Sequence, residues 1–132
     1  MIVVDSNVVA YLYLRGDHSD KAEALLARDP DWAAPLLWRS EFRNILAGHL
    51  RRKTLSFEAA LELQREAESL LAGAEYEVDS RQVLELVRDS DCSAYDCEFA
   101  ALAMALGVKL ATMDAKLLRA FPRLAVPLAA QR

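Results

Sequence analysis

The chain has 132 residues, 54% of them hydrophobic, and its 16 basic and 20 acidic side chains give a formal net charge of −4. This length and apolar content suffice for one domain whose core needs no disulfide or structural metal. The acidic balance excludes a globally basic nucleic-acid-binding protein, so any contact with nucleic acid depends on local charge. No apolar run approaches the roughly 20 residues that span a bilayer, and Asp5 interrupts the opening run too early for a secretory signal. We therefore expect a cytoplasmic protein without a membrane segment.

The N-terminal part of the chain predicts one strand and two helices. Residues 1–4 (MIVV) form an apolar run without polar alternation, which is typical of a strand buried on both faces of a parallel sheet. A short helix is expected next, with Ser6 or Asn7 as its N-cap and Gly16 as its C-cap. A second helix is expected from about Ser19.

The middle of the chain continues the alternation of strands and helices. Residues 32–37 (WAAPLL) are apolar and predict a short strand. Over residues 38–52 the apolar positions recur at helical spacing, which predicts an amphipathic helix with Glu41 in its first turn. Another helix is expected over 56–73, with a stop at Gly73, followed by a brief strand over 76–79.

The C-terminal part repeats the pattern, and Asp79 with Gln82 forms a capping box for its first helix. The expected elements are helices over 80–89, 93–107 and 115–121, and strands over 108–113 and 125–129. Strands interleaved with helices along the whole chain predict a three-layer α/β/α domain with a mainly parallel central sheet.

Four carboxylates occupy positions that this topology brings to one edge of the sheet. Asp5 and Asp114 follow predicted strands, and ligands of parallel sheets bind beyond the carboxyl ends of the strands. Glu41 and Asp96 lie near helix N-termini, which face the same edge. Each acid also has a purely structural explanation as a helix cap or dipole partner, and Ser93 followed by Asp96 resembles a capping box.

Together the four acids indicate chemistry, because clustered carboxylates repel one another unless protons or a cation neutralise them. An all-oxygen set favours Mg²⁺ or Mn²⁺, and such a site is suited to phosphoryl chemistry through activated water. No competing site is evident. His18 and His49 are far apart, and Cys92 and Cys97 lack zinc-ligand spacing. The two cysteines are five positions apart at a predicted helix start, where helical geometry would hold their α-carbons roughly 8 Å apart, beyond disulfide reach, so we expect reduced structural thiols. No GxSxG motif or glycine-rich phosphate loop occurs.

Four sequence pieces give the chain a family resemblance. "VVDSNV" at the start, "SEFRNIL" around Glu41, "SAYDCEFAALA" around Asp96 and "LATMDAKLL" around Asp114 follow one another as in PIN-domain proteins of the VapC toxin type, small ribonucleases of toxin-antitoxin pairs. The resemblance covers residues 1–132 and implies a single PIN-like domain. It also implies an endoribonuclease that depends on Mg²⁺ or Mn²⁺ and cuts an RNA phosphodiester with metal-activated water.

The resemblance assigns roles to the acids. Asp5 and Asp96 would be the principal metal ligands, Asp114 would lie beside them, and Glu41 would act directly or through water. Two polar residues match supporting positions of the family, namely Asn7 and Thr112. Lys116 stands where some relatives carry another acid, which leaves one optional ligand open.

Partners follow from the same resemblance. It implies a homodimer and a cognate antitoxin that lays a hydrophobic segment into a groove and points an arginine at the acids. Residues 8–14 carry more apolar and aromatic side chains than one buried helix face needs, so Tyr11 and Tyr13 belong either to an interface or to the core. Four arginines are candidate RNA contacts: Arg39, Arg43, Arg51 and Arg52.

Two other classes of function stay open at this stage. The first is a phosphohydrolase for small molecules with an aspartyl nucleophile, although Asn7 stands where such enzymes need a second acid. The second is a PIN-like binding module without catalytic activity.

Overall fold

The computed structural model describes residues 1–129, and in this part of the chain five short strands form one parallel sheet in the order β3-β2-β1-β4-β5. The strands are β1 (Ile2–Val4), β2 (Trp32–Pro35), β3 (Glu75–Tyr76), β4 (Leu110–Ala111) and β5 (Ala125–Val126). All four neighbouring pairs run parallel. The predicted α/β fold with a mainly parallel sheet is confirmed.

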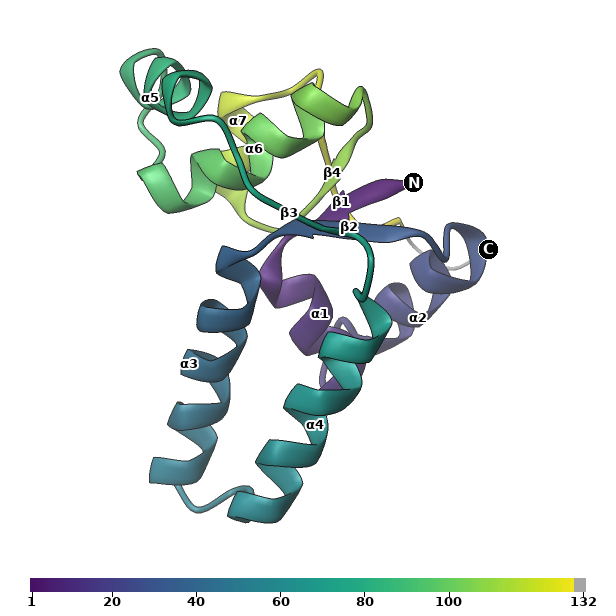
Figure 1. The fold of residues 1–132 in the computed structure, drawn as a ribbon. Coiled ribbons are helices and arrows are strands. Elements are labelled where there is room, and N and C mark those ends of the chain that lie inside the picture. The colour runs from purple at the N-terminus through teal and green to yellow at the C-terminus, as the bar shows by residue number, and fades with distance from the viewer. Residues whose placement is uncertain (130–132) are drawn as a thin grey trace.

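Helices cover both faces of the sheet (Figure 1). They are α1 (Ser6–Tyr13), α2 (Ser19–Arg28), α3 (Leu37–Arg51), α4 (Phe57–Leu70), α5 (Ser80–Arg88), α6 (Ala94–Leu106) and α7 (Ala115–Ala120). In Figure 1, α5, α6 and α7 lie on one side of the sheet and the first four helices on the other, where α3 and α4 form a long pair that extends away from it. The sheet is thus the middle of three layers.

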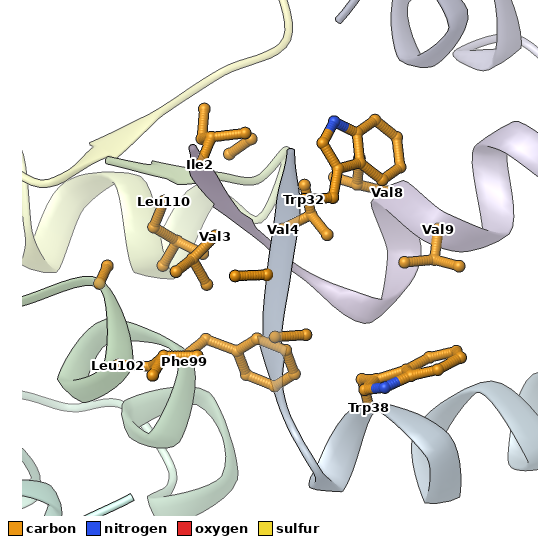
Figure 2. Close-up of a cluster of buried hydrophobic side chains, with 14 of the residues drawn as sticks. Ile2, Val3, Val4, Val8, Val9, Trp32, Trp38, Phe99, Leu102 and Leu110 are labelled. Atoms are coloured by element: carbon orange, nitrogen blue, oxygen red, sulfur yellow. The ribbon is translucent and has the colours of Figure 1, made fainter. Parts of the chain in front are cut away.

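The core is built on the central strands β1 and β2, in which every residue is buried. Figure 2 shows side chains of the core gathered where these strands meet α1, α3 and α6. Trp32, Trp38 and Phe42 are the largest fully buried side chains. Full burial of one large apolar side chain contributes roughly 1.5–3 kcal/mol, so this cluster fixes the positions of the strand ends that carry the polar residues.

The ends of α1 differ from the expected ones. Its N-cap is Asp5, whose Oδ1 accepts a hydrogen bond from the backbone N–H of Asn7 at 2.8 Å, so neither Ser6 nor Asn7 is the cap. The backbone of Asp5 is extended, so its carboxylate reaches the N–H of Asn7, the second residue of the helix. This contact explains why Asp5 is the cap. The helix ends at Tyr13 with Leu14 as C-cap, and Gly16 does not close it.

The start of α3 also corrects the sequence-based expectation. The helix begins at Leu37 after Leu36, earlier than Trp38, and its first turn holds no acid. Glu41 therefore lies in the second turn rather than the first, and it is not a dipole partner of the helix N-terminus.

Other boundaries are shorter than predicted. Helix α4 ends at Leu70, before Gly73, and strand β3 covers 75–76 rather than 76–79. Strand β4 covers only two residues of the predicted 108–113. The glycine stop after α6 is confirmed, because Gly107 adopts the left-handed conformation at φ 68°.

The two cysteines are free and buried, as expected for structural thiols. Cys92 precedes α6 and Cys97 lies within it. Their separation is therefore not set by helix geometry, contrary to the expectation from their spacing. Among the described residues, none of the helices combines the length and apolar character that a bilayer crossing requires.

Candidate active site

A pocket of about 360 Å³ opens at the carboxyl edge of the sheet, and all four predicted carboxylates line it. Asp5 follows β1, Glu41 comes from α3, Asp96 from α6, and Asp114 from the turn between β4 and α7. The remaining lining residues are Ser6, Asn7, Leu37, Ser40, Asn44, Ile45, Tyr95 and Phe99. The predicted meeting of the acids is therefore present, and their chemical roles stay predictions.

Asp5 is the most deeply buried of these acids, with 8% of its surface exposed. Its Oδ2 accepts a hydrogen bond from the Thr112 hydroxyl at 2.6 Å, and its Oδ1 accepts the one from Asn7 N–H. Burial raises the pKa of Asp5 and the negative charge of Asp114 adds to this, whereas the two hydrogen bonds act in the opposite direction.

Thr112 connects two of the acids. Its side chain is fully buried, and its Oγ1 accepts a hydrogen bond from the backbone N–H of Asp114 at 3.0 Å while donating to Asp5. Asp114 caps α7, because its Oδ1 accepts hydrogen bonds from the N–H groups of Lys116 and Leu117 at 2.8 and 3.0 Å. This chain of bonds places Asp114 at the pocket through the helix that it caps.

Glu41 is held from α1. The Ser6 hydroxyl donates to its Oε1 at 2.7 Å, which joins two residues that are 35 positions apart. Burial raises the pKa of Glu41, and the charges of Asp5, Asp96 and Glu98 raise it further against the lowering effect of Ser6. Its position in the second turn of α3 brings it to the pocket.

The Asp96 carboxylate does not complete the capping box that the sequence suggested. Ser93 caps α6 by accepting the Asp96 N–H at 3.1 Å. Within residues 1–129, no hydrogen bond returns from the Asp96 carboxylate to the Ser93 N–H, so only half of the capping box forms. Burial raises the pKa of Asp96 and so do the charges of Asp114 and Asp5, while Lys116 lowers it by a smaller amount. The carboxylate lines the pocket instead of closing the cap.

The donor set fits a hard divalent cation by its chemistry, because it offers carboxylate oxygens and raised carboxyl pKa values that a cation would relieve. In the described part of the chain no group of three or more histidine, cysteine, aspartate or glutamate side chains is arranged to hold a metal ion as it stands.

The predicted arginines do not line the pocket. Arg39 is paired through its Nε with Glu75 at 2.6 Å and through its Nη1 with Glu68 at 3.1 Å, in a network that ties α3 to α4 and β3. Arg43, Arg51 and Arg52 are exposed along α3 and at its end.

Several lining residues were not singled out from the sequence. On α3 they are Leu37, Ser40, Asn44 and Ile45, and on α6 they are Tyr95 and Phe99. For Leu37, Asn44, Ile45 and Phe99 the signal was available, because helix neighbours three or four positions from Glu41 and Asp96 share their faces. Ser40 and Tyr95 directly precede the two acids and had no such signal.

Comparison with known proteins gives consistent results. A family model of the PIN domain matches residues 2–124. The chain is 28% identical over 129 residues to "Ribonuclease VapC3" of Pyrobaculum aerophilum, which covers 96% of this chain and 98% of that protein.

Solved structures share the fold. The crystal structure of PAE2754 from Pyrobaculum aerophilum matches with a TM-score of 0.76 and 23% identity, over 96% of this chain and 83% of that one. A chain of a toxin-antitoxin complex from Klebsiella pneumoniae matches with a TM-score of 0.69 and 16% identity, over 96% of both chains. Since the family match spans β1 to α7 and includes all four carboxylates of the pocket, the chain belongs to the PIN domain family.

Proposed function

We propose that the protein is a metal-dependent endoribonuclease that acts as the toxin of a toxin-antitoxin pair. The observation that carries this proposal is the meeting of four carboxylates from four separate parts of the chain in one pocket. The name of the ribonuclease relative and the PIN match over residues 2–124 support the same reading. We also take residues 1–132 as one PIN-like domain.

The divalent ion would be Mg²⁺ or Mn²⁺, held by Asp5, Asp96 and Asp114, with Glu41 acting directly or through water. When bound, such an ion lowers the pKa of a water molecule and offsets charge that develops on the scissile phosphate. Relief of carboxylate repulsion supports this assignment, because burial and neighbouring acids raise the pKa values of Asp5 and Asp96.

The protein's own contribution is to hold the carboxylates in place. Thr112 and the Asn7 N–H fix both oxygens of Asp5, so this side chain has little freedom to rotate away. Ser6 orients Glu41 in the same manner. The raised pKa of Glu41 brings it closer to the range in which a carboxylate accepts and returns a proton efficiently, which suits a general base.

RNA contacts outside the pocket are assigned to the basic residues of α3. Arg43, Arg51 and Arg52 are exposed and available for phosphates. Arg39 stays a candidate RNA contact, but its guanidinium is already paired with Glu75 and Glu68, so a phosphate would compete with these two carboxylates.

The proposed partners are a second copy of the chain and an antitoxin protein. Tyr11 and Tyr13 of α1 are only partly buried, which leaves apolar surface for such a contact. The toxin-antitoxin complex from Klebsiella pneumoniae, whose chain shares this fold, is in line with the proposal. Light scattering of the purified protein tests the dimer by its mass.

The function is tested by incubating the antitoxin-free protein with mixed cellular RNA, in Mn²⁺ or Mg²⁺ and in EDTA. Asp96→Asn is prepared identically as the control for contaminating nucleases. Discrete fragments that need metal and the Asp96 carboxylate are the expected result. Hydrolysis of a small phosphate ester without RNA cleavage would favour the phosphohydrolase, and metal binding without any hydrolysis would favour a binding module.

A further inference from the structure

We propose that Tyr95 is a stacking platform for the nucleobase beside the scissile phosphate. This inference rests on the proposed function and assigns a substrate-contacting role to a residue outside the carboxylate set. Tyr95 directly precedes Asp96 in the first turn of α6 and lines the same pocket.

The exposure of Tyr95 is not explained by packing. The side chain is 63% exposed, which makes it one of the most exposed large apolar groups among the described residues. Within residues 1–129 it takes part in no hydrogen bond, ion pair or aromatic ring contact. An aromatic side chain in water at the rim of an acidic pocket offers a free π-face to a ligand.

The surroundings fit a base and a phosphate at the same time. Leu37 and Ile45 of α3 and Phe99 of α6 supply apolar surface in the pocket, and the carboxylates occupy its polar part. A nucleotide has the matching division, with an apolar base face and an anionic phosphate. A cation held by the carboxylates would attract the phosphate to their end of the pocket, which would place its base next to Tyr95.

The size of the pocket limits how much of an RNA strand enters it. A volume of about 360 Å³ is at the lower end of small-molecule sites and accepts one nucleotide unit at a time. A base inside a duplex is stacked and paired, whereas a base in a loop or a free strand can be turned out onto an aromatic ring. Stacking accepts any base, so Tyr95 would select for strandedness more than for sequence.

Kinetics on a single-stranded RNA that the wild-type protein cleaves provide the first test. Loss of one stacking contact lowers affinity roughly 5- to 150-fold, so we expect Tyr95→Ala to raise KM by that amount with a smaller effect on kcat. Tyr95→Phe keeps the ring and should retain the wild-type KM. Phe57→Ala removes an equally exposed aromatic ring, 65% exposed on α4 and outside the pocket, and should change nothing.

An abasic nucleotide placed on either side of the cleaved bond isolates the contact. On the substrate that lacks the stacked base, the wild-type protein and Tyr95→Ala should have the same KM. If Tyr95→Ala cleaves every substrate with the wild-type KM, the inference is wrong and the exposed ring serves a protein partner.

Binding keeps this test separate from the ribonuclease proposal. In the Glu41→Gln background with Mg²⁺, quenching of 2-aminopurine in a single-stranded RNA should require Tyr95. Quenching that requires Tyr95, together with a wild-type protein that cleaves no RNA, would overturn the ribonuclease proposal and leave the stacking site in place. Cleavage without Tyr95-dependent quenching, or no quenching at all, would overturn the stacking site.

Discussion

The Thr112 hydroxyl donates a 2.6 Å hydrogen bond to Oδ2 of Asp5, although the two residues are 107 positions apart. The bond joins the ends of β4 and β1, which are neighbours in the sheet. It is buried, and it opposes the effect of burial on the pKa of Asp5. Thr112 thus favours the charged form of Asp5 in a place that disfavours charge.

Thr112→Val should destabilise the protein by about 1–3 kcal/mol at pH 7, because a buried carboxylate and the Asp114 N–H lose their shared partner. Urea unfolding at constant protein concentration measures this change. Thr112→Ser keeps the hydroxyl and should lose much less. Equal stability of the valine and serine variants would show that the hydroxyl does not stabilise Asp5.

Asp96→Asn should stabilise the metal-free protein at neutral pH. Because the pKa of Asp96 is raised in the folded state, the folded protein binds more protons than the unfolded chain between the two pKa values. The charged Asp96 carboxylate therefore destabilises the folded wild-type protein fully above the folded pKa. This destabilisation disappears as the pH falls toward the ordinary value of 3.8. The advantage of the variant should shrink over the same interval.

Unfolding in EDTA from pH 8 to pH 4 measures the difference between Asp96→Asn and the wild-type protein. Since Asp96 is only partly buried, we expect a gain below about 1 kcal/mol. Asp91→Asn, on an exposed aspartate outside the pocket, is the matched control and should show no pH-dependent gain. A gain that stays constant with pH would mean that charge repulsion is not its cause.

Mg²⁺ or Mn²⁺ should raise the thermal midpoint, because an ion that binds only the folded state stabilises it. At a concentration 100 times Kd the stabilisation is about 2.7 kcal/mol. Asp5→Asn should reduce the shift, and the exposed control Glu62→Gln should retain it. An unchanged midpoint at millimolar ion would count against a metal site in this pocket.

Ser93→Ala tests whether the cap of α6 positions Asp96. Loss of an N-cap serine costs about 1 kcal/mol, and here it also frees the backbone N–H of Asp96. Ser56→Ala removes the cap of α4, which accepts the Ala59 N–H at 3.1 Å and lies outside the pocket. Both variants should lose similar stability, but only Ser93→Ala should slow RNA cleavage. Equal rates would assign Ser93 to stability alone.

The pattern of the sequence was sufficient for the layers and for the meeting of the four acids. Apolar runs predicted β1 and β2. Asp5 directly follows β1, and Asp114 follows β4 after two intervening residues. The topology of a parallel sheet then brought distant residues to one edge. The order of the elements therefore carried most of the prediction.

Details that depend on side-chain contacts were not predictable. The choice of Asp5 over Ser6 as the cap of α1 is made by one hydrogen bond to Asn7 N–H. The pairing of Ser6 with Glu41 needs the angle between α1 and α3, which no local pattern records. The same holds for the engagement of Arg39 by Glu75.

The most direct measurement compares single-turnover rates of RNA cleavage in Mn²⁺ for Asp5→Asn, Glu41→Gln, Asp96→Asn and Asp114→Asn against the wild-type protein and Glu62→Gln. Asparagine caps helices as well as aspartate does, so the variants at Asp5 and Asp114 keep the caps of α1 and α7, and Asp5→Asn also loses the hydrogen bond that Oδ2 accepts from Thr112. We expect each of the four to lose roughly 100-fold or more and Glu62→Gln to lose nothing. Rates equal to wild type in the four variants would contradict the assignment of this pocket as a ribonuclease active site.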